Sequence, residues 1–267
     1  MFFQTTVRLF TGTFKALFSN FENFLKICWA WFALMMLAQL VLGPGPQADP
    51  DTPMTAAPGD LLASVVFLAL ALLSSASISV AWHRCLLLNE TPPTVNLRVG
   101  GRELAYAGRF LLLMLIAGAL FVPLAFLTTA IIGAMDVSGG VFTVFVLSGV
   151  LILILLPLLA RIALILPACA LDEPLSVKEA FGSSAGLGGP MVLSGIAASL
   201  AVTLPLLALG WLVALGGGGM FSLVATLILS LAAQIAGTAL QIGILTGGYY
   251  ILRERQMAAG GAGGAPE

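Results

Sequence analysis

Six long apolar stretches divide this chain, and they constrain its fold more than any other feature of the sequence. A helix needs about 20 apolar residues to cross a hydrocarbon core of about 30 Å. The stretches cover approximately Leu25–Leu42, Leu61–Trp82, Phe110–Gly133, Val141–Ala160, Met191–Leu215 and Met220–Leu252. Of the 267 residues 60% are hydrophobic and 9% are charged, whereas soluble domains carry about 25% charged residues. The sequence therefore predicts an all-α, polytopic membrane bundle of six transmembrane helices.

The first 23 residues show a different pattern, with apolar residues at intervals of three and four. These residues are Phe3, Val7, Phe10, Phe14, Leu17, Phe18 and Phe21, and polar residues lie between them. The pattern predicts an amphipathic helix in the membrane interface over residues 1–23. Anchoring is the simplest function for such a helix, and sensing of curvature or binding of a partner is the alternative. The transmembrane domain then covers residues 24–255, and the glycine-rich tail 256–267 is expected to be disordered.

The basic residues predict the orientation of the chain. All 11 lysines and arginines fall before the first stretch or at its start, between the second and third, between the fourth and fifth, or after the sixth. The other connections carry Asp49, Asp51, Asp60 and Asp136 and no basic residue. Since cytoplasmic loops are enriched in lysine and arginine, both termini should be cytoplasmic in a bacterial inner membrane. With a net charge of −1 and no basic patch, nucleic acid is not an expected partner.

A similar break follows the second and the fourth apolar stretch. Leu88-Asn89-Glu90 matches Leu171-Asp172-Glu173, and Thr94-Val95 matches Ser176-Val177. The match predicts two hairpin-like repeats, over about 61–133 and 141–215. In the second copy Ser176 and Glu179 form a capping-box pattern, so a short helix is expected over Val177–Ala185. Thr94 is the corresponding cap in the first copy.

The acids of the second break allow two interpretations. Asp172 and Glu173 are expected to be solvated turn residues, because a metal site needs further ligands that the sequence does not identify. Under that interpretation, replacing either acid by its amide should have little effect, whereas Ser176→Ala should be destabilising because it removes a helix cap.

The second half of the chain resembles a known group of proteins. The matching features are Arg161, the segment ALILPACALDEPLSVKEAFGSSAGLGGP that follows it, and GGYYILRER at 247–255. They resemble bacterial six-helix membrane proteins, including the membrane domain fused to some glycerophosphodiester phosphodiesterases. The resemblance implies a helical bundle that accompanies envelope or lipid-related processes, and it implies no catalytic residue.

Three features suggest chemistry, but each has a simpler explanation. GSSAG at 182–186 fits Gly-x-Ser-x-Gly, yet no strand is expected before Ser184, as a hydrolase elbow would require. The single histidine, His83, lies beside Trp82 and is expected to anchor the helix at the interface. The three cysteines lie apart in apolar surroundings and are expected to be buried hydrophobic residues. No catalytic, metal or cofactor site is therefore predicted.

The expected function is that of a non-enzymatic scaffold or accessory subunit, with the lipid bilayer and another membrane protein or a second copy as partners. The alternative is a permease for an apolar or zwitterionic, lipid-like substrate. Pro123, Pro157 and Pro205 lie inside three of the apolar stretches and would kink helices around a cavity in that case. No ionisable residue lies near the middle of any stretch, which disfavours an ion-coupled transporter.

The orientation can be tested by labelling single cysteines in intact cells. A cysteine introduced near Pro46 should react with a membrane-impermeant reagent, while one near Ser176 should be protected, because the connection that carries Pro46 is expected outside and the one that carries Ser176 is expected in the cytoplasm. The reverse pattern would contradict the predicted topology.

Overall fold

The computed structural model describes residues 2–42, 58–134, 137–173, 175–217 and 219–262. Six of its helices are long and apolar enough to cross a membrane. They are α2 (Phe21–Leu42), α3 (Pro58–Leu88), α4 (Gly101–Ala134), α5 (Val137–Ile162), α8 (Gly188–Leu215) and α9 (Met220–Ala262). Each predicted apolar stretch lies inside one of them. The protein is therefore a polytopic α-helical membrane protein, as the sequence predicts.

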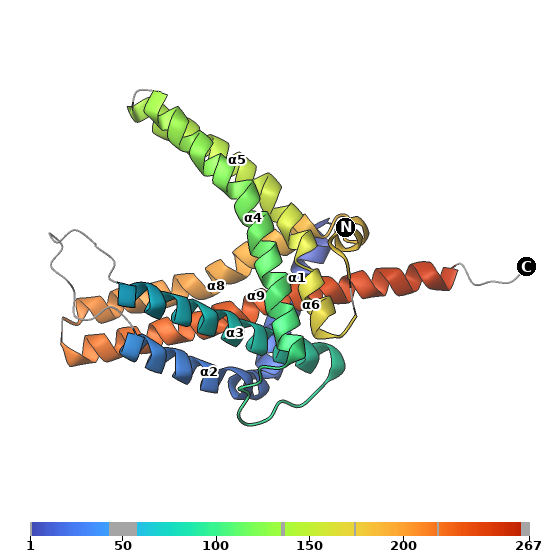
Figure 1. The fold of residues 1–267 in the computed structure, drawn as a ribbon, viewed down its shortest axis with the longest axis horizontal. Coiled ribbons are helices and arrows are strands. Elements are labelled where there is room, and N and C mark those ends of the chain that lie inside the picture. The colour runs from blue at the N-terminus through green and yellow to red at the C-terminus, as the bar shows by residue number, and fades with distance from the viewer. Residues whose placement is uncertain (1, 43–57, 135–136, 174, 218, 263–267) are drawn as a thin grey trace, which may run out of the picture.

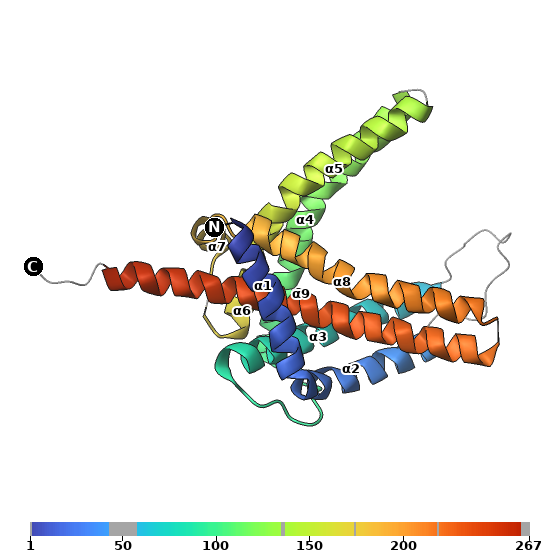
Figure 2. The same ribbon diagram turned by 180° about the vertical axis from the view of Figure 1, so that it is seen from behind.

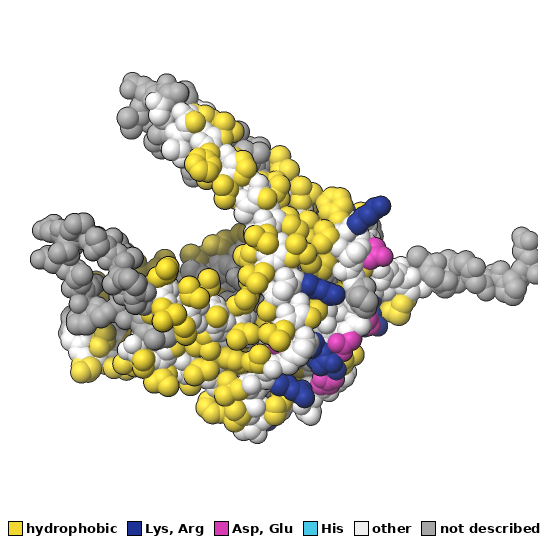
Figure 3. Space-filling model, in the orientation of Figure 1, with side chains coloured by type: hydrophobic (Ala, Val, Ile, Leu, Met, Phe, Trp, Pro, Cys, Tyr) yellow, Lys and Arg dark blue, Asp and Glu magenta, His cyan; other side chains and the backbone are white. Residues whose placement is uncertain are grey.

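The spans form two groups within the bundle. Helices α2, α3, α8 and α9 lie side by side, whereas α4 and α5 form a hairpin that points away from them (Figures 1 and 2). The base of the hairpin packs against α3 and α8. On the face seen in Figure 3 the described surface is largely hydrophobic, and the charged side chains gather at the end of the molecule from which α9 protrudes.

Helix α1 (Phe2–Ser19) confirms the predicted amphipathic helix and shows how it is attached. It crosses α8 and α9, and this contact buries Thr6, Leu9, Thr13 and Leu17. Phe2, Phe3 and Phe18 remain exposed as an aromatic cluster. The helix thus has one side for the protein and another for lipid. It ends one residue before Asn20, and α2 begins directly after that residue.

Helix α6 (Ile165–Ala170) was not predicted from the sequence. All six of its residues are buried, and it packs against α3, α4 and α9. Pro167 explains why it is separate from α5: proline has no N–H to bond the carbonyl of Ala163, and its ring clashes with that carbonyl. The chain accordingly turns at Ala163 and Leu164 before α6 begins.

The two breaks share one backbone feature. Among the described residues other than glycine, only Asn89 and Asp172 have a positive φ, of 55° and 61°. These two residues occupy matching positions in the sequence comparison, and asparagine and aspartate tolerate this left-handed conformation better than other side chains. The two turns therefore share their backbone geometry at this pair of positions.

After the shared turn the two copies differ. Helix α7 (Val177–Ser183) has the predicted capping box: Glu179 N donates to Ser176 Oγ at 3.2 Å, and Ser176 N donates to Glu179 Oε2 at 2.9 Å. The expectation for Thr94 was wrong, because no helix starts there. The chain is non-helical from Asn89 to Gly100, and the Thr94 carbonyl accepts the indole N–H of Trp29 at 2.7 Å.

The C-terminal boundary also differs from the expectation. Helix α9 continues to Ala262, so residues 256–262, which were expected to be disordered, are helical. Residues 263–267 of that tail lie outside the described residues, as do residues 43–57 of the first connection and Pro174.

At Gly188 the contact between α8 and α5 leaves room only for glycine. A Cβ atom on Gly188 would overlap the carbonyl oxygen of Pro157 and lie 2.9 Å from the carbonyl carbon. Gly188→Ala should therefore push α8 away from α5 and destabilise the protein by about 1–3 kcal/mol, as overpacking does. The measurement is thermal unfolding in detergent. Gly182→Ala is the matched control, because its Cβ meets no atom within 4 Å, and equal stability of the two variants would contradict this contact.

Candidate functional site

Ion pairs and hydrogen bonds join the end of α3, the start of α4 and the turn after α6 to α9, and we call this cluster the arginine joint. Its members are Arg84, Glu90, Arg102, Asp172, Glu173, Tyr249 and Arg253. These side chains come from both halves of the chain and meet around the turn that follows α6. The joint is the largest group of interacting charged side chains in the part of the chain that the structure describes.

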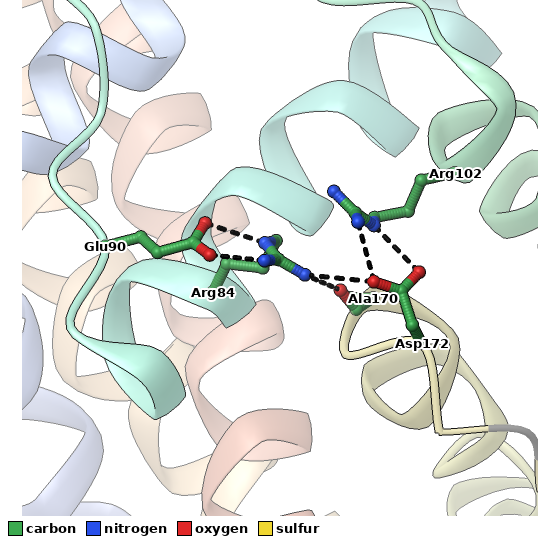
Figure 4. Close-up of polar contacts among 5 residues, drawn as sticks. All are labelled: Arg84, Glu90, Arg102, Ala170 and Asp172. Carbon is green, nitrogen blue, oxygen red and sulfur yellow. Dashed lines mark hydrogen bonds and ion pairs between the residues drawn. The ribbon is translucent and has the colours of Figure 1, made fainter.

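Arg84 is the centre of the joint (Figure 4). Its guanidinium pairs with both carboxylate oxygens of Glu90, with 2.7 Å from Nε to Oε2. Its Nη1 donates to the carbonyl oxygen of Ala170 at 3.1 Å and lies 3.4 Å from Asp172 Oδ2. One arginine therefore connects the end of α3, the loop that follows it and the end of α6.

Asp172 receives a second arginine from α4. Arg102 donates to both of its carboxylate oxygens, at 2.9 Å from Nε and 2.6 Å from Nη2. The expectation of a merely solvated acid was therefore wrong, although the side chain is 58% exposed. The hydrogen bonds from Arg102 and its charge, together with those of Arg84, hold the pKa of Asp172 below its usual range.

Glu173 ties the same turn to α9. It accepts the hydroxyl of Tyr249 at 2.6 Å and pairs with Arg253 Nη2 at 3.2 Å. Adjacent acids thus contact different helices, Asp172 towards α3 and α4 and Glu173 towards α9. This division explains why the turn carries two acids in succession, each with its own protein partners.

Other arginines at this end of the molecule bind backbone carbonyls. Arg109 Nη1 donates to Ile165 O at 3.4 Å, and Arg255 Nη1 donates to Ala185 O at 3.0 Å. Arg161 Nη2 donates to Phe181 O, and its guanidinium carbon lies 3.8 Å from the centre of the Phe181 ring. The carbonyls of Phe181 and Ala185 lie in the last turn of α7 and in the turn after it, where intrahelical partners are lacking, so Arg161 and Arg255 satisfy them.

The side chain of His83 is enclosed by the protein and faces neither lipid nor water, so the expectation of an interfacial anchor was wrong. The side chain is fully buried among α3, α4 and α9. Thr246 donates its only hydroxyl proton to Ile242 O at 2.7 Å, so the hydroxyl must accept from His83 Nδ1, 2.8 Å away. Nε2 is then the acceptor for Tyr106, at 3.3 Å. Both ring nitrogens bind the protein, and the histidine links three spans.

Ser184 also has a structural environment. It is fully buried at the end of α7, and its Oγ lies 3.3 Å from Arg161 Nε. The segment before it is helical, so it does not have the strand-to-helix geometry of a hydrolase elbow. The serine therefore helps to hold the turn between α7 and α8.

The cysteines Cys28, Cys85 and Cys169 are buried and unpaired, which confirms their expected environment. In the described residues no group of three or more histidine, cysteine or acidic side chains is arranged to hold a metal ion.

Comparison of the chain with protein-family models, with curated proteins and with solved structures gave no match.

The sequence patterns do not predict the contacts of the arginine joint. The basic residues indicate the topology of the chain, and the acids indicate turns, but neither pattern pairs one with the other. One signal was available: Asn89-Glu90 and Asp172-Glu173 are acid-bearing turns next to spans whose loops carry several arginines. Which acid meets which arginine depends on the packing of α6 between distant helices, and no spacing in the sequence contains that information.

Substitutions at Asp172 can separate its backbone role from its charge. Asp172→Ala removes both the carboxylate and the tolerance for a φ of 61°, whereas Asp172→Asn removes only the charge. An exposed ion pair contributes at most about 1 kcal/mol. The left-handed conformation costs alanine about 1–2 kcal/mol, whereas asparagine and aspartate offset this cost through local hydrogen bonds of their side chains. Thermal unfolding in detergent should therefore rank stability as wild type, then Asn, then Ala.

Asp172→Gly is the control, because glycine accepts the positive φ without carrying the charge, and it should resemble Asp172→Asn. If Asp172→Asn were as destabilising as Asp172→Ala, the charge alone would dominate.

The contribution of Asp172 to stability also depends on pH, with a definite sign. Since the pKa of Asp172 is lowered in the folded state, its contribution is complete above about pH 4 and is lost as the pH falls through the folded-state pKa.

Proposed function

We propose that this protein is a non-catalytic scaffold or accessory subunit of a bacterial inner membrane. In this proposal both termini face the cytoplasm, and the protein serves envelope or lipid-related processes, as the sequence resemblance implies. The observation that carries the proposal is the separation of the α4–α5 hairpin from the other four spans (Figures 1 and 2).

The hairpin has side chains available for lateral contact in the membrane. Leu112, Leu115 and Phe126 of α4 are exposed, as are Leu153 and Ile154 of α5. At its base the hairpin is held against α3, α8 and α6. Lipid solvates apolar side chains as well as protein does, so helices associate there through close packing. A hairpin attached at one end leaves its outer half free to pack against another membrane protein or a second copy.

The cavities support a scaffold more than the alternative of a permease. The crevice between α8 and α9, of about 520 Å³, is lined mainly by apolar side chains such as Leu206, Leu207 and Trp211. The ion pairs and the buried histidine lie instead at the end of the spans where the arginines gather. A polar path for a zwitterionic substrate would need such groups along the spans.

Photo-crosslinking tests the proposal. A crosslinking amino acid placed at Phe126 or Leu115 of α4 should give one discrete protein adduct in cells, with a yield several-fold above that from Leu68 of α3. Phe126, Leu115 and Leu68 are exposed to similar extents, 73%, 71% and 70%, so exposure to lipid is matched. An adduct with a differently tagged copy identifies self-association, and any other protein identifies the partner. Equal yields from all three positions, or adducts with lipid only, would contradict the proposal.

A further inference from the structure

A crevice lies between α1, the end of α3 and α9, apart from the arginine joint and the hairpin. Figure 2 shows α1 crossing α9 at this place. The crevice has a volume of about 370 Å³, which is within the usual range for a small-molecule site. Its walls include Leu9 of α1, Leu86 and Leu87 of α3, and Ile251 of α9. These residues form a largely apolar space beside the interfacial helix.

Glycines create this space. A side chain added at Gly12 would meet no atom within 4 Å, so this position faces open volume. Gly247 lets Leu9 approach α9, since a Cβ there would lie 3.0 Å from the leucine side chain. Gly243 does the same for Thr13, at 2.7 Å from its Cγ2. The glycines of α9 therefore bring α1 close, and Gly12 of α1 leaves the crevice empty.

Polar groups line the crevice as well. Arg8 pairs with Glu254 Oε1 at 2.8 Å through Nη2, which leaves other donors of its five N–H groups for a ligand. Thr13 is buried, and its hydroxyl has no hydrogen-bond partner among the described residues. A buried hydroxyl without a partner costs free energy, so an acceptor brought into the crevice would relieve an unfavourable state.

The location matches the level of lipid headgroups. Helix α1 belongs to the end of the molecule where charged side chains gather, and Phe3 and Phe18 of the same helix are exposed. An amphipathic helix of this kind lies at the boundary between headgroups and acyl chains. A crevice under it therefore opens where lipid molecules are present at high local concentration.

We propose that this crevice binds one phospholipid with an anionic headgroup. Arg8 contacts the headgroup, and an acyl chain lies along Leu9, Leu86, Leu87 and Ile251. An arginine at one end of an apolar wall fits an anionic amphiphile. A zwitterionic lipid of the same chain length fits the walls equally well but gains less from the arginine.

Native mass spectrometry of the full chain in mild detergent tests the proposal. The probes are dioleoylphosphatidylglycerol and dioleoylphosphatidylcholine, which share acyl chains and differ in headgroup charge. The wild type should bind one phosphatidylglycerol about fivefold more tightly than phosphatidylcholine, the factor expected for one arginine near an anionic surface. Gly12→Leu fills the crevice and should abolish this adduct. Gly118→Leu, another helical glycine with no atom within 4 Å of its Cβ, is the matched control and should behave as wild type.

A second pair of variants tests the headgroup contact. Arg8→Gln should remove the preference for phosphatidylglycerol, whereas Glu254→Gln breaks the same ion pair but keeps the arginine and should retain it. Neither variant adds a larger side chain to the crevice, so they decide the question even if Gly12→Leu unfolds the protein. Excess inorganic phosphate should not displace the lipid, and displacement would indicate a site for free phosphate. Equal binding of both lipids by the wild type, or an undiminished adduct in folded Gly12→Leu, would overturn the proposal.

Discussion

Backbone carbonyls at the ends of helices lack intrahelical hydrogen-bond donors, and arginines supply donors to them here. Arg84 binds the carbonyl of Ala170, the last residue of α6, and Arg161 binds that of Phe181 in the last turn of α7. Within lipid, a broken helix is tolerated only where its free backbone groups are satisfied. The chain can therefore stop α5, insert the buried helix α6 and start again at α7, because arginines surround each interruption.

The two polar networks hold this end of the molecule together in different ways. The arginine joint is partly exposed, so its ion pairs are screened by water and salt, and much of their effect lies in geometry rather than in free energy. The hydrogen bonds of His83 to Thr246 and Tyr106 are buried between three spans. Polar groups in such surroundings are unfavourable unless they are paired, so this pairing favours a single arrangement of α3, α4 and α9.

This organisation connects the fold to the proposed functions. Helices are tied together at the charged end, where α6 is buried and α1 crosses α8 and α9, whereas the α4–α5 hairpin extends away from that end. The proposed lipid crevice lies under α1, and the proposed partner surface lies on the hairpin. A scaffold of this form would contact lipid and protein through separate surfaces on a common rigid base.

The sequence by itself determined the class of the protein and most of its helices. Apolar stretches of spanning length are a local property, so all six spans could be predicted, as could the amphipathic α1 and the capping box of Ser176 and Glu179. The contacts of the arginine joint, the burial of His83 and the separation of the hairpin could not. They depend on which helices become neighbours, and helices that are apolar on all sides carry little information about their partners. Only the tertiary structure brings Asp172 to Arg102, across 70 positions of sequence, because the packing of α6 between α3, α4 and α9 decides where its final turn lies.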